Sequence, residues 1–235
     1  MKSKIWIYIG LMFAMAVWAY SYVLIKIVYS YGVPPTMLVF MRLVLASATL
    51  IAFTKIARKL QVIQKKDRFS FLALAFFEPF LYYIGESNGL VYVSPTVGSI
   101  IIATIPVFTP FVLYAYFKEK VDKTNFFGII ISFIGVLLVI FEDDYTLSAS
   151  PVGLGFMFFA VLSAFGYTIV IKNLTQKYNS YTIVTYQTLI GAILYIPLFL
   201  FSDFTVISNV DFTWQMFAAT ATLAVFATAI AYILF

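Results

Sequence analysis

Long apolar stretches alternate with short polar segments along the whole chain. A helix needs about 20 residues to cross the hydrocarbon core of a bilayer. The predicted spans cover residues 5–28, 37–53, 71–93, 96–117, 125–141, 153–171, 183–201 and 214–235. None of them shows the period-2 alternation of a barrel strand, and backbone groups in lipid must be hydrogen-bonded within their own segment. The pattern therefore predicts eight membrane-spanning helices.

The composition agrees with this pattern. Hydrophobic residues make up 63% of the chain and charged residues 11%, whereas soluble domains carry roughly a quarter charged residues. The apolar run after Lys4 is too long for the core of a signal peptide, so we interpret it as the first transmembrane helix. The expected fold class is all-α, a polytopic helical membrane protein.

Basic residues are found at the amino terminus and in every second loop. They are Lys2, Lys4, Lys55, Arg58, Lys59, Lys65, Lys66, Arg68, Lys118, Lys120, Lys123, Lys172 and Lys177. The intervening loops at 29–36, 92–95, 142–151 and 202–213 contain no Lys or Arg. Because cytoplasmic loops are enriched in Lys and Arg, the amino terminus is predicted to lie in the cytoplasm. The net charge of +5 follows from these loops, and no nucleic-acid partner is expected.

Glycine and proline positions indicate packing and bending. Gly85-x-x-x-Gly89 in the third span is predicted to let a neighbouring helix approach closely, and Gly128 with Gly135 is predicted to do so in the fifth.

Prolines lie inside several spans, where each removes a helical hydrogen bond and can kink the helix. They are Pro79, Pro106, Pro110 and Pro197. Two of them stand one turn apart in the fourth span, which is therefore expected to be bent.

A weak internal repeat relates the two parts of the chain. Residues 18–26 resemble 164–172, and Arg42 falls opposite Gln187 at an offset of about 145 residues. A unit of five helices would enter the membrane from opposite sides in its two copies, as in secondary transporters. We predict a first repeat over 1–141, an external linker over 142–152 and a second repeat over 153–235. The second repeat is expected to be truncated, so that about eight of ten helices are present.

Two carboxylates in the third span, Glu78 and Glu86, lie where hydrocarbon disfavours charge by about 3 kcal/mol or more. Glu86 is predicted to bind a substrate ammonium group or to titrate in proton coupling. The structural alternative is a carboxyl held neutral by a hydrogen bond, or one paired with Lys26 or Arg42. Glu78 borders the same cavity in the functional interpretation, and bends the helix or reaches the interface in the structural one.

Other polar and aromatic residues complete the candidate site. Arg42 and Lys26 either hold a substrate carboxylate or extend to the outer headgroups. Gln187 either faces inward or bridges helices. Aromatic faces attract cations and amphipathic solutes, so an aromatic cavity wall is possible, although packing is the commoner role. Its candidates are Trp18, Tyr20, Tyr22, Tyr82, Tyr83 and Tyr167, of which Trp18 and Tyr83 are favoured.

The chain contains no cysteine and no histidine. Thiol nucleophiles, histidine bases and soft metal sites are thereby excluded. No Gly-x-x-x-x-Gly-Lys-Ser/Thr motif is present, which argues against direct ATP drive. We expect no catalytic, metal or cofactor site.

Several motifs occur in an order that resembles a known family. They are Lys26 at the end of the first helix, Pro34-Pro35…Phe40-Met41-Arg42-Leu43…Ala46, Ser94-Pro95-Thr96…Ala103-Thr104-Ile105-Pro106-Val107-Phe108-Thr109-Pro110…Lys118-Glu119-Lys120, and Gly128…Gly135-Val136. The order resembles the drug/metabolite transporter superfamily, EamA type, over essentially the whole chain. The resemblance implies ten helices in two inverted five-helix repeats, a central cavity, and export of amino acids, related metabolites or drugs. The chain departs from this pattern in lacking the ninth and tenth helices.

The function predicted from the sequence is therefore secondary transport. The protein would export small amphipathic or zwitterionic metabolites, amino-acid-like or drug-like, across the inner membrane by alternating access. The predicted substrate-binding residues are Glu86, Arg42, Trp18, Tyr83, Glu78, Lys26 and Gln187. The alternatives are a non-transporting membrane interaction subunit or fragment and, with less support, a membrane-embedded enzyme. The oligomeric state is left open.

Overall fold

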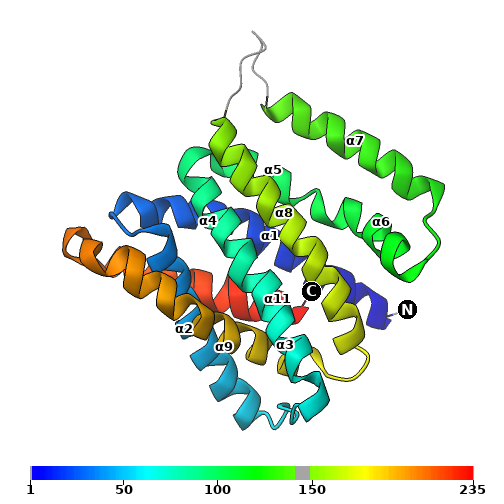
Figure 1. Cartoon of the computed structure of the whole chain (residues 1–235), viewed down its shortest axis with the longest axis horizontal. Helices are drawn as coiled ribbons and strands as arrows, with labels where there is room; N and C mark the ends of the chain where they lie inside the picture. Colours follow the sequence, from blue (N-terminus) through cyan, green and yellow to red (C-terminus); the bar gives the residue numbers. More distant parts are fainter. Residues whose placement is uncertain (1, 141–148, 235) are drawn as a thin grey trace.

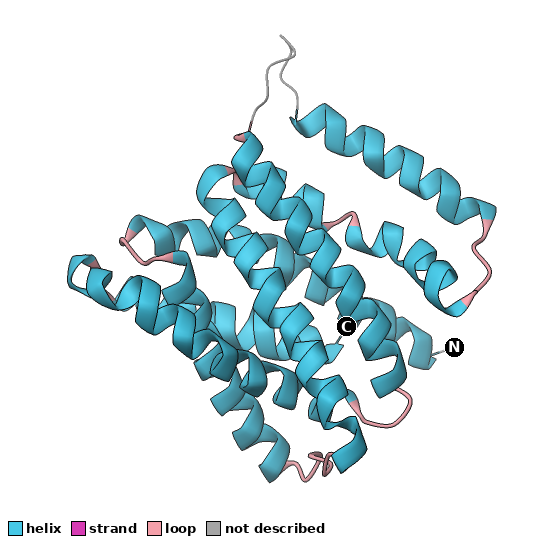
Figure 2. Cartoon of the chain, in the orientation of Figure 1, coloured by secondary structure: helices cyan, strands magenta, loops and turns pink. Residues whose placement is uncertain are grey.

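The computed structural model describes residues 2–140 and 149–234 (Figure 1). This part of the chain consists of helices joined by short connections, with no strand (Figure 2). The first two helical rods are α1 (Lys2–Ser30) and α2 (Pro35–Ile56). The third rod follows the short η1 (Lys65–Asp67) and consists of α3 (Arg68–Ala75), η2 (Phe76–Leu81) and α4 (Tyr82–Tyr92). The fourth consists of α5 (Pro95–Ile102) and α6 (Ile105–Phe117). The next rods are α7 (Lys123–Ile140), α8 (Pro151–Leu174) and α9 (Ser180–Leu198), and α9 is followed by η3 (Phe199–Asp203) and η4 (Phe204–Asn209). The last rod consists of α10 (Trp214–Thr222), η5 (Leu223–Ile230) and α11 (Ala231–Leu234).

Within the described residues, six helical rods are long and apolar enough to cross a membrane. A seventh, α7, has a shorter apolar stretch, Phe126–Leu138. The rod from α3 to α4 contains Glu78 and Glu86. The predicted polytopic, all-α membrane fold is confirmed. Most of the predicted 142–152 linker lies outside the described residues.

Prolines mark the breaks inside the rods. The fourth span divides after Ile102, and Pro106 lies in the first turn of α6, where a missing backbone N–H costs nothing. The predicted bend of this span is confirmed. In the third rod Glu78, just before Pro79, has extended dihedral angles (φ −144°, ψ 117°) inside the π-helical η2. The residue before a proline disfavours the α region, which accounts for this break.

The packing of the rods is reciprocal. The first rod, α1, packs against α10, η5 and α11, and α8 packs in the same way against α3, η2 and α4. Between these pairs α2 lies along α9. In Figure 1, α7 lies at one edge of the molecule beside α6. The centre therefore lies where α2, α4, α8, α9 and η5 meet.

Glycines allow the close crossing of α4 and α8. A Cβ on Gly85 would stand 2.6 Å from the carbonyl oxygen of Phe156 and 2.7 Å from the amide nitrogen of Ala160. The predicted packing role of Gly85 is confirmed. The same prediction for Gly128 and Gly135 is wrong, because a Cβ on either would meet nothing within 4 Å.

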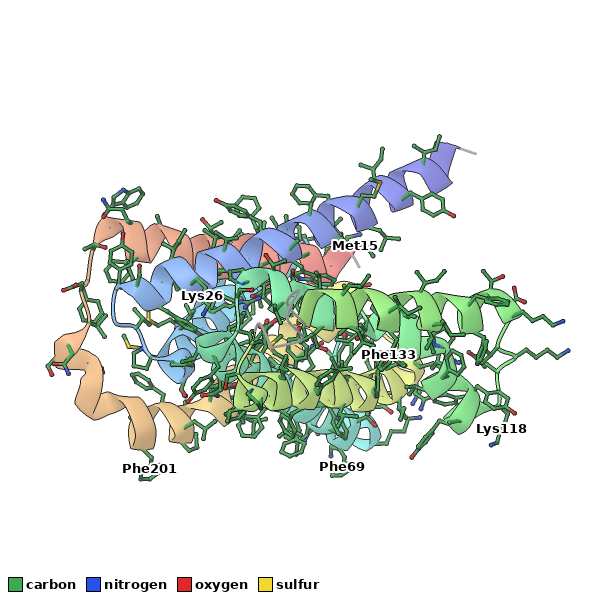
Figure 3. The ribbon with its side chains drawn as sticks, turned by 90° about the horizontal axis from the view of Figure 1, so that it is seen from above. Met15, Lys26, Phe69, Lys118, Phe133 and Phe201 are labelled. Carbon is green, nitrogen blue, oxygen red and sulfur yellow. The ribbon has the colours of Figure 1, made fainter. Side chains whose placement is uncertain are left out.

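The basic loops gather at one end of the molecule. Lys177 donates to Asp67 Oδ1 over 2.7 Å, and the Tyr178 hydroxyl donates to Oδ2 over 2.9 Å. Lys172 forms an ion pair with Glu119. Figure 3 shows Lys118 and the start of α1 toward one end, and Lys26 and Phe201 toward the other. The α2–α3 loop, the α6–α7 loop and the α8–α9 turn are thus linked by polar contacts on one side.

The Asp67 contacts predict a pH dependence. The hydrogen bond from Lys177 lowers the pKa of Asp67 below its ordinary value, with Tyr178 acting in the same direction. A carboxylate whose folded-state pKa is depressed stabilises the protein above the unfolded-state pKa, about 4, and loses this effect as the pH falls through the folded-state value. At pH 7 we expect Asp67→Asn to melt at a lower temperature than the parent in detergent, and the difference to shrink below about pH 4. Asp122→Asn, at an exposed acid, is the control. Equal melting temperatures of Asp67→Asn and parent at pH 7 would contradict the prediction.

The glycine contacts predict opposite effects of one substitution at two sites. In Gly85→Ala the new methyl group meets backbone atoms that cannot rotate away, and overpacking typically costs about 1–3 kcal/mol. In Gly128→Ala the methyl group enters open space, and alanine is the better helix former by about 1 kcal/mol. Melting curves in detergent should show a loss of stability only for Gly85→Ala. A stable Gly85→Ala protein would show that the α4–α8 crossing is not rigid.

Candidate functional site

A buried pair of opposite charges lies between α2 and α4. Arg42 Nη1 is 3.9 Å from Glu86 Oε2, and the two residues are 4% and 5% exposed. The other carboxylate oxygen of Glu86 accepts hydrogen bonds of 2.9 Å from the hydroxyls of Tyr22 and Tyr82. The Oε2 atom is buried and has no hydrogen-bond partner among the described residues. Glu86 thus has one fully bonded oxygen and one that only faces a guanidinium group.

Arg42 makes two further contacts, one with Thr228 and one with Tyr83. Its Nε donates to Thr228 Oγ1 over 2.5 Å, and its guanidinium carbon lies 4.6 Å from the centroid of the Tyr83 ring. Thr228 in turn donates to the Leu223 carbonyl over 3.1 Å, a bond of the π-helical η5. The arginine therefore connects the second rod to the last one, which is 186 residues distant in the sequence.

Burial makes this pair mutually dependent. Removing one partner of a buried ion pair leaves an uncompensated charge, which typically costs about 3–5 kcal/mol. The 3.9 Å separation is longer than that of a well-formed charge-assisted hydrogen bond. The two charges thus stabilise one another and keep unused hydrogen-bonding capacity.

Glu78 occupies a different environment. It lies in η2, is 8% exposed, and accepts a hydrogen bond from the Tyr232 hydroxyl of α11. Its carboxylate has no Lys or Arg nitrogen within 4 Å in the described part of the chain. The cavity bordered by both carboxylates stays a prediction. In the structure η2 interrupts the regular helix between Glu78 and Glu86, and their hydrogen-bond partners differ.

Trp18 joins α1 to the last rod. Its Nε1 donates to the Ala227 carbonyl over 2.9 Å, and its ring lies edge-on to Tyr232, with centroids 5.5 Å apart. Trp18 is thus connected to Glu78 through Tyr232, whose hydroxyl bonds that carboxyl group.

The remaining predicted residues lie apart from the ion pair. Gln187 on α9 is buried, and its Oε1 has no hydrogen-bond partner among the described residues. Lys26 is half-buried, and its Nζ lies 3.5 Å from the Val91 carbonyl. The structure thus brings Arg42, Glu86 and Tyr83 together, places Glu78 with Trp18 through Tyr232, and leaves Lys26 outside.

Sequence reasoning missed two hydroxyl residues that bond the buried charged groups: Thr228 bonds Arg42, and Tyr232 bonds Glu78. Both belong to the last span, which contains no charged residue to attract notice. The internal repeat was the available signal for Tyr232, because the offset of about 145 residues places Tyr232 opposite Glu86. Neither residue type is unusual in an apolar helix, so composition alone would not have found them.

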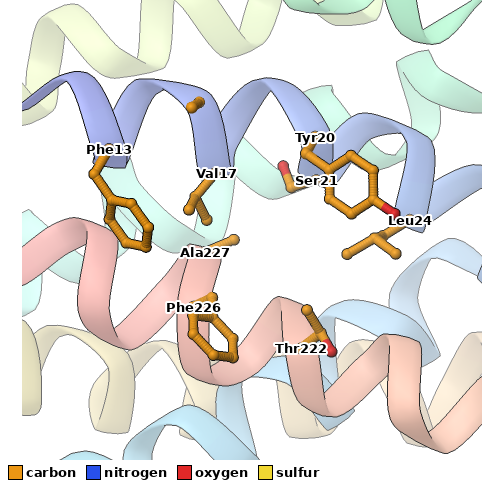
Figure 4. Close-up of a pocket in the computed structure, with 9 residues that line it drawn as sticks. Phe13, Val17, Tyr20, Ser21, Leu24, Thr222, Phe226 and Ala227 are labelled. Carbon is orange, nitrogen blue, oxygen red and sulfur yellow. The ribbon is translucent and has the colours of Figure 1, made fainter.

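An apolar groove lies between α1 and the last rod, with a volume of about 390 Å³ (Figure 4). Its lining consists of Phe13, Ala16, Val17, Tyr20, Ser21, Leu24, Thr222, Phe226 and Ala227. The hydroxyls of Ser21 and Thr222 donate to carbonyls of their own helices. With no charged lining residue, the groove offers no specific polar recognition, and we locate the candidate site at the charged pair instead.

Comparisons with known proteins agree with this picture. A model of the EamA-like transporter family matches residues 5–141 and 151–235. An uncharacterized transporter of Archaeoglobus fulgidus is 31% identical over 131 residues, which are 56% of this chain and 46% of that protein. A second one from the same organism is 28% identical over 235 residues, covering 99% of this chain and 79% of the relative. The uncharacterized transporter YetK of Bacillus subtilis is 24% identical over 226 residues, or 93% and 68% of the two chains.

The first of these matches spans about half the length of the relative. A solved crystal structure superimposes with a TM-score of 0.67 at 15% identity, covering 96% of this chain and 76% of the other. At that identity the likeness supports the fold alone.

The ion pair predicts a non-additive mutant cycle. Arg42→Met leaves Glu86 buried without its cation, and we expect a loss of about 3–5 kcal/mol in unfolding free energy. Changing both residues to Met removes both desolvated charges, so the double variant should recover most of that loss. Titration with a denaturing detergent measures the free energies. Lys26→Met, outside the pair, is the control and should change stability by less than about 0.5 kcal/mol. Additive losses in the double variant would exclude the coupling.

Proposed function

Because the chain belongs to the EamA-like transporter family, we propose that it is a secondary transporter of small zwitterionic or amphipathic metabolites. The choice of substrate class rests on one observation. The Arg42–Glu86 pair offers a buried cation and a buried anion side by side, and Glu86 Oε2 has no hydrogen-bond partner among the described residues.

A zwitterion complements both members of the pair. An ammonium group would donate to Glu86 Oε2, and a carboxylate would accept from guanidinium N–H groups, of which Nε is already bonded to Thr228. Such a substrate replaces the long contact between the two residues with two charge-assisted bonds. Buried polar atoms without partners are rare in proteins, and a ligand is one explanation for them.

Aromatic residues would hold the rest of the substrate. The Tyr83 ring already faces the Arg42 guanidinium, and the Tyr22 and Tyr82 hydroxyls fix one oxygen of Glu86. Ring faces suit an apolar body next to charged groups. Substrates with an aromatic or aliphatic side chain are thus favoured over small polar ones.

Transport would occur by alternating access between two inverted repeats, residues 1–141 and 153–235. The reciprocal packing of α1 on the last rod and of α8 on the third supports two equivalent halves. The charged pair lies at their junction, since Arg42 contacts both α4 and η5. Rocking of one half against the other would expose it to either side in turn.

The proposed orientation has the amino terminus in the cytoplasm of an inner-membrane protein that exports its substrate. The basic loops support this orientation, because polar contacts hold the α2–α3, α6–α7 and α8–α9 connections at one end. Positively charged loops are typical of the cytoplasmic side.

Counterflow in proteoliposomes tests the proposal. The full-length protein is reconstituted in vesicles preloaded with one unlabelled amino acid, and entry of the labelled form is followed for each of the twenty amino acids. We expect exchange of apolar or aromatic amino acids and at least a tenfold weaker exchange in Glu86→Gln. Asp122→Asn, at an exposed loop acid bonded only to its neighbours, is the control.

Two analogues test the zwitterion itself. Phenethylamine lacks the carboxylate of phenylalanine, and phenylpropionate lacks the ammonium group. Each should compete at least tenfold less well than phenylalanine, because each meets only half of the pair. Equal competition by all three, or exchange of no amino acid at all, would refute the proposed substrate class.

A further inference from the structure

We propose that Glu78 carries the proton whose movement drives transport, separately from the Arg42–Glu86 pair that binds substrate. This inference rests on the proposed function. It assigns a role to the second buried carboxylate, which the substrate site does not use.

The position of Glu78 is built into the fold. Side chains of other rods bond backbone carbonyls at the η2 break: Ser163 donates to the Phe77 carbonyl over 2.5 Å, and Tyr195 to that of Phe80 over 3.2 Å. Backbone groups at this depth must find partners within the protein. The residues on either side of Glu78 pack against glycines of other helices. The Phe77 ring occupies the space that a Cβ on Gly166 would need, and the Pro79 ring occupies the space that a Cβ on Gly191 would need. Contacts from α8 and α9 therefore hold the break in place, and the break fixes the position of the Glu78 carboxyl group.

The two carboxylates differ in their counter-ions. Glu86 faces the Arg42 guanidinium and accepts two tyrosine hydroxyls. Glu78 has the Tyr232 hydroxyl as its bonded side chain, and no Lys or Arg nitrogen lies within 4 Å of it among residues 2–140 and 149–234. A buried carboxylate without a cation neutralises itself by taking up a proton. Glu78 is thus suited to hold a proton, and Glu86 to remain a counter-ion.

The groups around Glu78 fit this assignment. The titratable and charged residues near it are Tyr232 on α11, Tyr167 on α8, Arg42 on α2, and Tyr82, Tyr83 and Glu86 on α4. The other two elements packed against η2 add little charge, because α9 contains no charged residue and α3 only Arg68 at its first position. Arg42 is the one cation in the set, and its contacts go to Glu86, Thr228 and Tyr83.

The contact to Tyr232 connects the proton to the conformational change. Glu78 belongs to the third rod and Tyr232 to the last, so their hydrogen bond joins the two proposed halves. When the halves separate on one side, the carboxyl group loses this donor and meets water, to which it transfers its proton. Reprotonation from the opposite side completes the cycle, with one proton moving against the exported substrate.

A comparison of exchange with gradient-driven uptake tests the inference. Proteoliposomes containing the full-length protein receive labelled phenylalanine, or the best amino acid of the counterflow panel, once without a gradient and once with an imposed pH gradient. We expect Glu78→Gln to keep counterflow within about twofold of the parent and to lose at least tenfold in gradient-driven accumulation. Glu78→Asp should restore part of the accumulation, and Asp122→Asn should keep both activities.

Each outcome separates the two proposals. Gradient-driven accumulation that persists in Glu78→Gln overturns the role of Glu78. A parent protein that exchanges substrate but does not respond to the gradient also overturns it, and leaves the proposed function intact. A parent protein without any exchange refutes the proposed function instead.

A second variant applies if Glu78→Gln does not fold. Tyr232→Phe removes the hydroxyl that donates to Glu78 and keeps the ring that packs against Trp18. We expect it to shift the pH profile of gradient-driven uptake by at least half a pH unit with counterflow retained. An unchanged profile would overturn the inference.

Discussion

The burial of charge at bilayer depth is the constraint on which the rest of this structure depends. Arg42 and Glu86 are almost fully buried, and neither charge can stay there without the other. Their remaining contacts come from α1 through Tyr22 and from η5 through Thr228. One ion pair therefore specifies how the first, second, third and last rods meet. Apolar helices in lipid gain little from burying more hydrocarbon against each other, so polar contacts of this kind carry much of the specificity of the fold.

The third rod places two identical functional groups in two different environments. Regular α-helix around Glu86 lets Tyr82, one turn earlier, bond its carboxylate. At Glu78 the following proline removes the helical geometry, and the carboxyl group turns toward α11 instead. Proteins give different roles to two residues of the same type by placing their titratable groups in contrasting surroundings. The break in η2 is thus the feature that separates a counter-ion from a proton carrier in the proposed mechanism.

Much of the fold followed from local sequence, and the site followed only in part. Apolar length predicted the spans, and paired prolines predicted the division between α5 and α6. The glycine rule succeeded at Gly85 and failed at Gly128, because a glycine in an apolar span does not by itself reveal whether another helix packs against it. The sequence marked Arg42 and Glu86 as costly in lipid and gave their pairing as the structural alternative, but it did not decide between Arg42 and Lys26 as the partner. Thr228 and Tyr232 were missed since hydroxyl groups are tolerated in any apolar helix, and their partners lie more than 150 residues away.

The π-helical breaks in the third and last rods suggest why a duplicated scaffold suits this chemistry. The segment η2 lies in the third rod and η5 in the last, about 145 residues later, and each packs against the long helix of the opposite half, α9 or α2. The two breaks contribute different groups to the centre, an acid at Glu78 and a hydroxyl at Thr228. Because each break packs against the long helix of the other half in the same way, both halves can move about the same centre. Unequal side chains then place the proposed substrate pair and the proposed proton carrier in the first half, while the last rod supplies the Thr228 and Tyr232 hydroxyls that bond Arg42 and Glu78 across the junction.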